Sequence, residues 1–312
     1  MKRFLFLATF LVCGCKYPTN SASHDSNSET IEAITLFGDT LKTPKVVSGK
    51  MFDNYMKVKK QFEDLPNSVE TIIWYGRRTA YLGHFKNAIS IYTEGIKKFP
   101  EEARLYRHRG HRYITTRSYD KAIEDFKTAA KLMKDKPNQI EPDGLPNAKN
   151  IPISTLKGNI WYHLGLAYYL KGDFENALWA YQQRDDVNTN NDNIVSEGHW
   201  LYMILKRMGR DNEAKTEIES ITLDMDIIEN VNYHKMCLFY KGLLKIKDLK
   251  IMGDGSSSDD VFLYGIGNWY LYQKNDTTKA KKYFKRLLES GNPFSFAYLA
   301  AESDWEKLFK RP

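Results

Sequence analysis

The sequence predicts an all-α solenoid of stacked helix–turn–helix units, because one pattern of small and aromatic residues recurs every 34 positions. Two copies correspond position by position: Gly76, Phe85, Ala88 and Tyr92 recur as Gly110, Tyr119, Ala122 and Phe126. A third copy follows an insertion: Trp161, Leu164, Gly165, Tyr168, Gly172, Phe174, Ala177 and Tyr181. A period of this length is typical of stacked helix pairs, in which small residues let two helices approach and large ones fill the space beside them.

The helical pattern predicts one solenoid over residues 51–312, beginning with a helix that ends before Pro66. The predicted units share the helix–turn–helix pattern: clear repeats at 69–100, 103–133 and 158–184, degenerate repeats at 198–221, 230–250 and 260–291, and a terminal helix at 294–309. The insertion at 134–155 contains four prolines, so we expect it to loop out of the stack. A long insertion in a compact stack is often functional, and this one is placed to close over one edge of a groove.

The N-terminus predicts a processed signal over residues 1–14. Lys2 and Arg3 precede the apolar run Phe4–Val12, which is too short for a bilayer span of roughly 20 residues. The sequence Val12-Cys13-Gly14-Cys15 resembles the lipobox of bacterial lipoproteins, in which the cysteine after a small residue is lipidated. The resemblance implies a lipid on Cys15, with Cys13 as the second candidate. The alternative is a soluble secreted protein.

Residues 15–50 are rich in Ser, Thr and Asn and predict a lipidated flexible tether. The lipoprotein resemblance implies membrane attachment in the bacterial cell envelope. Lys16 stands where an aspartate would signal inner-membrane retention, which favours the outer membrane. Loss of Lys2 and Arg3 would lower the net charge from +7 to +5 (7 − 2), a modest excess that does not indicate a nucleic-acid partner. Cys237 would then be the remaining thiol, predicted to be a buried hydrophobe.

The repeated units resemble tetratricopeptide repeats over about 69–291. The pattern that carries the resemblance is Trp/Tyr, Leu-Gly, Tyr, Gly-x-Phe/Tyr, Ala, Tyr/Phe and a closing Pro. The tracts 72–78, 107–112 and 267–272 are similar to those of uncharacterised tetratricopeptide proteins of bacterial envelopes. The resemblance implies a right-handed superhelix whose concave groove holds a peptide or protein segment, and it implies no biochemical activity.

In that family, one row of residues on the first helices lines the groove. The matching row in this chain provides eight candidate partner-binding residues: Arg77, Tyr81, Arg104, Arg107, His111, Asn159, Tyr162 and Tyr169. Arginine pairs with carboxylates and tyrosine adds contact area, so we expect an acidic or aromatic-rich partner segment. The alternative is that the arginines are solvated or pair with Glu70, Glu101 and Glu102.

Sequence motifs give no support for catalysis, a cofactor or a metal site. The chain has no G-x-S-x-G elbow, H-E-x-x-H motif, phosphate loop or dinucleotide fingerprint. His108 and His111 lack a third ligand at suitable spacing, and 186–197 resembles a calcium loop in which Asn191 replaces the glycine, so calcium there stays open. We therefore expect a non-enzymatic envelope scaffold. The alternatives are a glycan-binding lipoprotein that uses tryptophans, or a subunit of an outer-membrane assembly complex.

Overall fold

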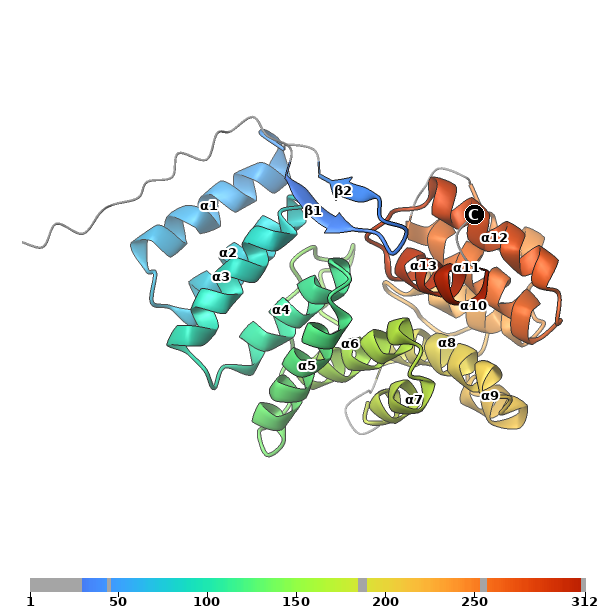
Figure 1. Ribbon diagram of the computed structural model, residues 1–312. Helices are drawn as coiled ribbons and strands as arrows, with labels where there is room; N and C mark the ends of the chain where they lie inside the picture. Colours follow the sequence, from blue (N-terminus) through green and yellow to red (C-terminus); the bar gives the residue numbers. More distant parts are fainter. Residues whose placement is uncertain (1–29, 44–45, 185–189, 253–256, 310–312) are drawn as a thin grey trace, which may run out of the picture.

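The computed structural model describes residues 30–43, 46–184, 190–252 and 257–309, and these residues form sequential stacked helix pairs (Figure 1). A first helix, α1 (Lys50–Asp64), precedes the pairs and ends before Pro66, as predicted. The three segments with the clear repeat pattern each form a helix pair: α2 (Val69–Tyr81) with α3 (Phe85–Lys98), α4 (Ala103–Thr115) with α5 (Tyr119–Met133), and α6 (Leu156–Lys171) with α7 (Phe174–Gln182).

The second half continues the stack with shorter or interrupted units. Its elements follow in order: α8 (Asn191–Arg207), α9 (Asp211–Glu217), α10 (Val231–Tyr240), the 3-10 helix η2 (Ile246–Leu249), α11 (Ser257–Tyr272), α12 (Thr277–Ser290) and the terminal α13 (Phe296–Leu308). The unit predicted at 230–250 thus has one α-helix and a short 3-10 turn. Gly242, at φ +80°, follows the end of α10.

Glycines that face aromatic rings set the close approach within the helix pairs. A Cβ atom at Gly110 would lie 2.9 Å from the Phe126 ring, and one at Gly165 would lie 2.6 Å from the Tyr181 ring. Both aromatic side chains are fully buried, so the rings have no free space into which they can move. The predicted packing of small against large residues is therefore confirmed.

The segment predicted to be a flexible tether contains a β-hairpin, so that prediction is wrong for residues 31–42. Strands β1 (Ile31–Ile34) and β2 (Thr40–Lys42) pair antiparallel. The buried carboxylate of Glu32 accepts a 2.9 Å hydrogen bond from the Lys86 amide at the start of α3. The Leu36 amide donates to Glu302 of α13 over 3.0 Å. The hairpin thus joins the first helix pair to the last helix (Figure 1). It is held in place by hydrogen bonds to residues that lie far away along the chain. The signal, Cys15 and residues 15–29 lie outside the described residues.

The terminal helix α13 turns back onto the middle of the stack. Lys307 donates to the Leu170 carbonyl at the end of α6 over 3.0 Å, and Arg207 of α8 donates to Asp304 over 2.8 Å. The Phe296 ring lies 5.4 Å from the His111 ring of α4. The faces of α4, α6 and α8 therefore pack against the chain's own C-terminal helix. Within the described ranges, no helix combines the length and apolar character needed to cross a bilayer.

Candidate functional site

Two of the predicted groove residues belong to the core. Tyr162 is 8 % exposed and its hydroxyl accepts a 2.8 Å hydrogen bond from the Trp200 indole. Tyr169 is 3 % exposed and its hydroxyl lies 2.6 Å from that of Tyr264 in α11. The prediction that these tyrosines line an open groove is therefore wrong, because α11 and the beginning of α13 pack against them. Trp200 is equally buried, so it presents no surface to a sugar.

The insertion at 134–155 brings a carboxylate onto the predicted arginine row. Glu141 is buried, with its oxygens 3.0 Å from Arg107 Nε, 3.4 Å from His108 Nε2 and 2.9 Å from the Asn159 amide nitrogen. The Arg77 guanidinium donates to the Pro142 carbonyl over 2.8 Å. Arg107 and Asn159 are thus engaged by the chain's own insertion, which supplies the acidic group expected from a partner.

Arg104 follows the alternative that the sequence left open. Its guanidinium lies 2.9 Å from Glu102 and also contacts Glu70. Burial alone would raise the pKa of Glu102, but the hydrogen bonds and the charge of Arg104 together outweigh burial and lower that pKa. Arg104 is therefore satisfied at the surface by carboxylates within the first two pairs.

A polar cavity of about 110 Å³ remains between α2 and α4. Its lining is rich in cationic and aromatic side chains: Arg77, Ala80, Tyr81, Tyr92, Arg107, His108, His111 and Arg112. None of these lining residues is a carboxylate. Tyr81 packs against Gly144 of the insertion, and His111 packs against Phe296 of α13. Four of the predicted residues (Arg77, Tyr81, Arg107 and His111) therefore meet at this cavity.

Arg112 is the lining residue that the sequence analysis missed. In the described part of the chain its guanidinium makes no hydrogen bond or ion pair, and it lies 5.6 Å from the Phe85 ring centroid. Burial lowers the pKa of Arg112 to about 10, and the charges of Arg107 and Arg77 act in the same direction against Tyr92 and Tyr81. The periodic pattern does not predict that Arg112 lines a cavity, because an arginine next to a row of packing residues is normally expected to point into solvent.

The two histidines in the cavity are neutral near pH 7. Burial, followed by the charges of Arg107, Arg77 and Arg112, holds the pKa of His108 well below its ordinary value of 6.5. Burial and Arg112 do the same for His111. Because Glu141 balances Arg107, the remaining positive charge of the cavity comes from Arg77 and Arg112. A negatively charged group that enters the cavity would be stabilised there.

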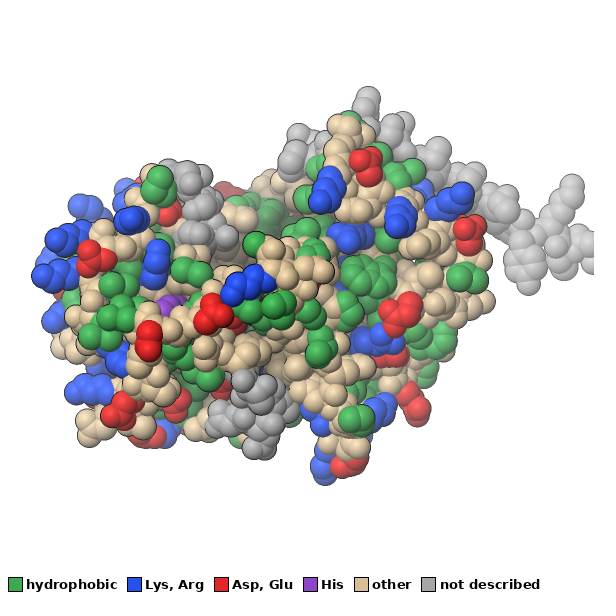
Figure 2. Space-filling view, turned by 180° about the vertical axis from the view of Figure 1, so that it is seen from behind, with side chains coloured by type: hydrophobic (Ala, Val, Ile, Leu, Met, Phe, Trp, Pro, Cys, Tyr) green, Lys and Arg blue, Asp and Glu red, His purple; other side chains and the backbone are tan. Residues whose placement is uncertain are grey.

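Other predicted features are distributed elsewhere. Cys237 is fully buried, as predicted. Among the described residues, no group of three or more His, Cys, Asp or Glu side chains is arranged to hold a metal ion. Residues 185–189 of the calcium-loop resemblance lie outside the described residues, and Glu197 at its end lies 3.2 Å from Arg184. On the face shown in Figure 2, basic side chains are interspersed with acidic and apolar ones.

The sequential stacking of helix pairs defines a helical-repeat protein. Models of the tetratricopeptide repeat match residues 158–183 and 262–293, which correspond to α6 with α7 and α11 with α12. The chain therefore contains tetratricopeptide repeats in these two segments. The second match falls on the unit at 260–291 that the sequence analysis ranked as degenerate, where Gly267 faces Phe284 as in the clear repeats.

Comparison with solved structures returns matches of low sequence identity. One is YrrB, described as a TPR protein with an unusual peptide-binding site; it is 16 % identical, with 78 % of this chain and 95 % of that chain covered, at a TM-score of 0.42. Another is Naa15/Naa10 bound to HypK-THB, at 13 % identity, 76 % and 36 % coverage and a TM-score of 0.35, so this chain spans about a third of the length of that one. No curated protein matches the chain.

Proposed function

We propose that the chain is a non-enzymatic scaffold that binds a protein segment through an acidic side chain inserted between α2 and α4. The observation that carries the proposal is the cavity lined by Arg77, Arg107 and Arg112 without a carboxylate. Of these three, Arg112 is half-buried and makes no ion pair within the described ranges, so an anion that enters the cavity would gain the attraction of a guanidinium that no carboxylate neutralises. The 110 Å³ volume corresponds to three or four water molecules at about 30 Å³ each, which suits a carboxylate group.

The insertion supports the same chemistry. Glu141 already occupies the neighbouring position, where it meets Arg107, His108 and Asn159. The side chain of Arg112 remains available for a second carboxylate, and a guanidinium can hold both oxygens of such a group. The partner segment would therefore pass beside the insertion, with one acidic side chain directed at Arg112.

The test is binding of a fluorescein-labelled hexaglutamate peptide to the full chain and to Arg112→Ala. The substitution removes a cation that makes no ion pair in the fold, so we expect folding to persist and affinity to fall by about tenfold or more. Arg286→Ala, which removes an exposed arginine from α12, is the matched control and should leave affinity unchanged. Equal affinity of the Arg112→Ala and unaltered chains would contradict the proposal.

We further propose that Cys15 carries a lipid that attaches the chain to a membrane of the bacterial envelope, most simply the outer membrane. The supporting features are the charged start, the short apolar run and the lipobox-like Cys13-Gly14-Cys15. Metabolic labelling with an alkyne palmitate in a bacterial host tests this proposal. We expect Cys15→Ser to abolish the label and release the chain from the membrane fraction, whereas Cys13→Ser retains both. A label that persists in Cys15→Ser would refute the assignment.

A further inference from the structure

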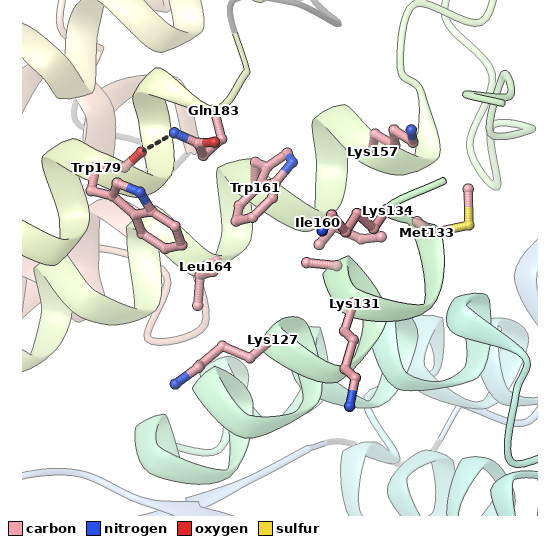
Figure 3. Close-up of a pocket in the computed structure, with 11 residues that line it drawn as sticks. Lys127, Lys131, Met133, Lys134, Lys157, Ile160, Trp161, Leu164, Trp179 and Gln183 are labelled. Atoms are coloured by element: carbon pink, nitrogen blue, oxygen red, sulfur yellow. Dashed lines mark hydrogen bonds between the residues drawn. The ribbon is translucent and has the colours of Figure 1, made fainter. Parts of the chain in front are cut away.

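A second and larger pocket lies between α5, α6 and α7, and it shares no lining residue with the arginine cavity. Its volume is about 540 Å³, within the roughly 300–1,000 Å³ that ligand pockets occupy. Trp161, Leu164 and Trp179 lie on one side of it, and side chains of α5 lie on the other (Figure 3). The lining therefore combines the surfaces of three helices around one opening.

The two tryptophans form an accessible aromatic corner. Their rings meet edge to face, with centroids 5.5 Å apart. Trp179 is 45 % exposed, whereas Ala177, Ala180 and Tyr181 on the same short helix are buried. Trp179 is thus not needed to fill the core-facing side of α7, and its side chain lines the pocket instead. An exposed tryptophan beside an apolar recess is a typical anchor point for a partner side chain.

Lysines surround this apolar corner. Lys127 and Lys131 are four residues apart, so they share one side of α5, and Lys134 and Lys157 complete the set (Figure 3). Across the described ranges, no ammonium group of these four pairs with a carboxylate, and no lining residue is acidic. The rim is therefore positively charged around an apolar centre, which complements a partner with the opposite charge around an apolar residue.

We propose that this pocket is a second docking surface, for an acidic protein segment that inserts one large apolar side chain against Trp161 and Trp179. The carboxylates that flank this side chain would meet Lys127, Lys131 and Lys157. The concave shape favours a protruding side chain over a flat anionic lipid surface, because the tryptophan corner is recessed between helices. The scaffold would then hold two segments, one through the arginine cavity and one through this pocket.

The experiment measures binding of fluorescent twelve-residue peptides to the full chain. The first peptide consists of Asp and Ser with one central Phe, the second replaces Phe with Ala, and the third replaces Asp with Lys. We expect the second and third to bind at least about tenfold more weakly than the first. Trp179→Ala and the double variant Lys127→Glu/Lys131→Glu should each weaken the first peptide at least about tenfold as well. All three altered side chains are exposed, so the fold is expected to persist.

Two control variants test whether the peptide binds at this pocket. Lys282→Glu/Arg286→Glu reverses two exposed charges on α12 and should leave affinity unchanged. Arg112→Ala acts on the arginine cavity alone, so it should leave unchanged the ratio between the affinities of the Phe peptide and the Ala peptide. Failure of all the peptides to bind, or equal binding by Trp179→Ala, would overturn the proposal. So would competition by phosphatidylglycerol vesicles that is lost in the Lys127→Glu/Lys131→Glu variant, because that result would assign the lysines to a lipid surface.

Discussion

Buried neutral histidines should make the fold sensitive to mild acid. Burial lowers the pKa of His199 to about 3, and burial and the nearby arginines hold the pKa values of His108, His111 and His163 well below 6.5. In the unfolded chain these groups return to their ordinary pKa of about 6.5. As the pH falls through that value, the unfolded state takes up protons that the folded state excludes, so stability is lost on acidification.

The magnitude follows from the proton linkage. Each histidine that stays neutral in the fold removes about 1.4 kcal/mol of stability for every pH unit below the unfolded pKa. Because each group is only half protonated at its unfolded pKa, the loss per histidine between pH 6.5 and 5.5 is about 1 kcal/mol, and four such groups together remove about 4 kcal/mol. That loss is comparable with the ~5–15 kcal/mol of a typical domain. Carboxylates titrate mainly near pH 4, so the histidines dominate this interval.

Urea unfolding at pH 7.0 and pH 5.5 measures the effect directly. His199→Gln removes one of the four titrating groups, so the difference in unfolding free energy between the two pH values should shrink by roughly a quarter. The comparison is internal to each variant and is independent of the stability that the substitution itself removes. An unfolding free energy that is equal at the two pH values would refute the reasoning that these histidines are held neutral.

Two further substitutions test the packing. Gly165→Ala places a Cβ atom 2.6 Å from the buried Tyr181 ring. The overpacking penalty of about 1–3 kcal/mol exceeds the gain of about 1 kcal/mol in helix propensity over most of its range, so the urea midpoint should fall, and a higher midpoint would contradict the packing. Asp304→Asn leaves the buried Arg207 without its carboxylate, so we expect a loss of about 3 kcal/mol and faster proteolysis within α13, whereas unchanged proteolysis would show that this pair does not hold the helix.

The parts of the fold that were predictable rest on contacts close in sequence. Gly110 meets Phe126 within one helix pair, so the 34-residue pattern already contains both partners. The hairpin is different, because Glu32 is held by Lys86 and Leu36 by Glu302. A polar segment of this kind shows no strong pattern of its own, and its order comes from hydrogen-bond partners that lie far away along the chain.

The candidate site likewise has one part that the sequence predicts and one part that depends on contacts between residues far apart in the chain. Helical periodicity predicts that Arg77 and Arg107 occupy one row across two neighbouring helices, and in the structure both line the cavity between α2 and α4. What covers that face could not be predicted, because Glu141 comes from an irregular insertion and Phe296 from the opposite end of the chain. Tyr162 therefore has the right position on its helix for a groove residue, yet it is buried by a segment that the repeat pattern does not locate.

The absence of a carboxylate partner within the described residues distinguishes Arg112 from three buried arginines of the chain. The side chains of Arg107, Arg117 and Arg207 are buried, and each lies against a buried carboxylate: Glu141, Glu302 and Asp304. A buried ion that loses its partner costs about 3–5 kcal/mol, which explains why these three are paired within the chain. Arg112 lines a cavity with no acidic side chain, so the fold gains no ion pair from its charge. A carboxylate from a partner segment would give Arg112 the kind of partner that the chain itself provides for Arg107, Arg117 and Arg207.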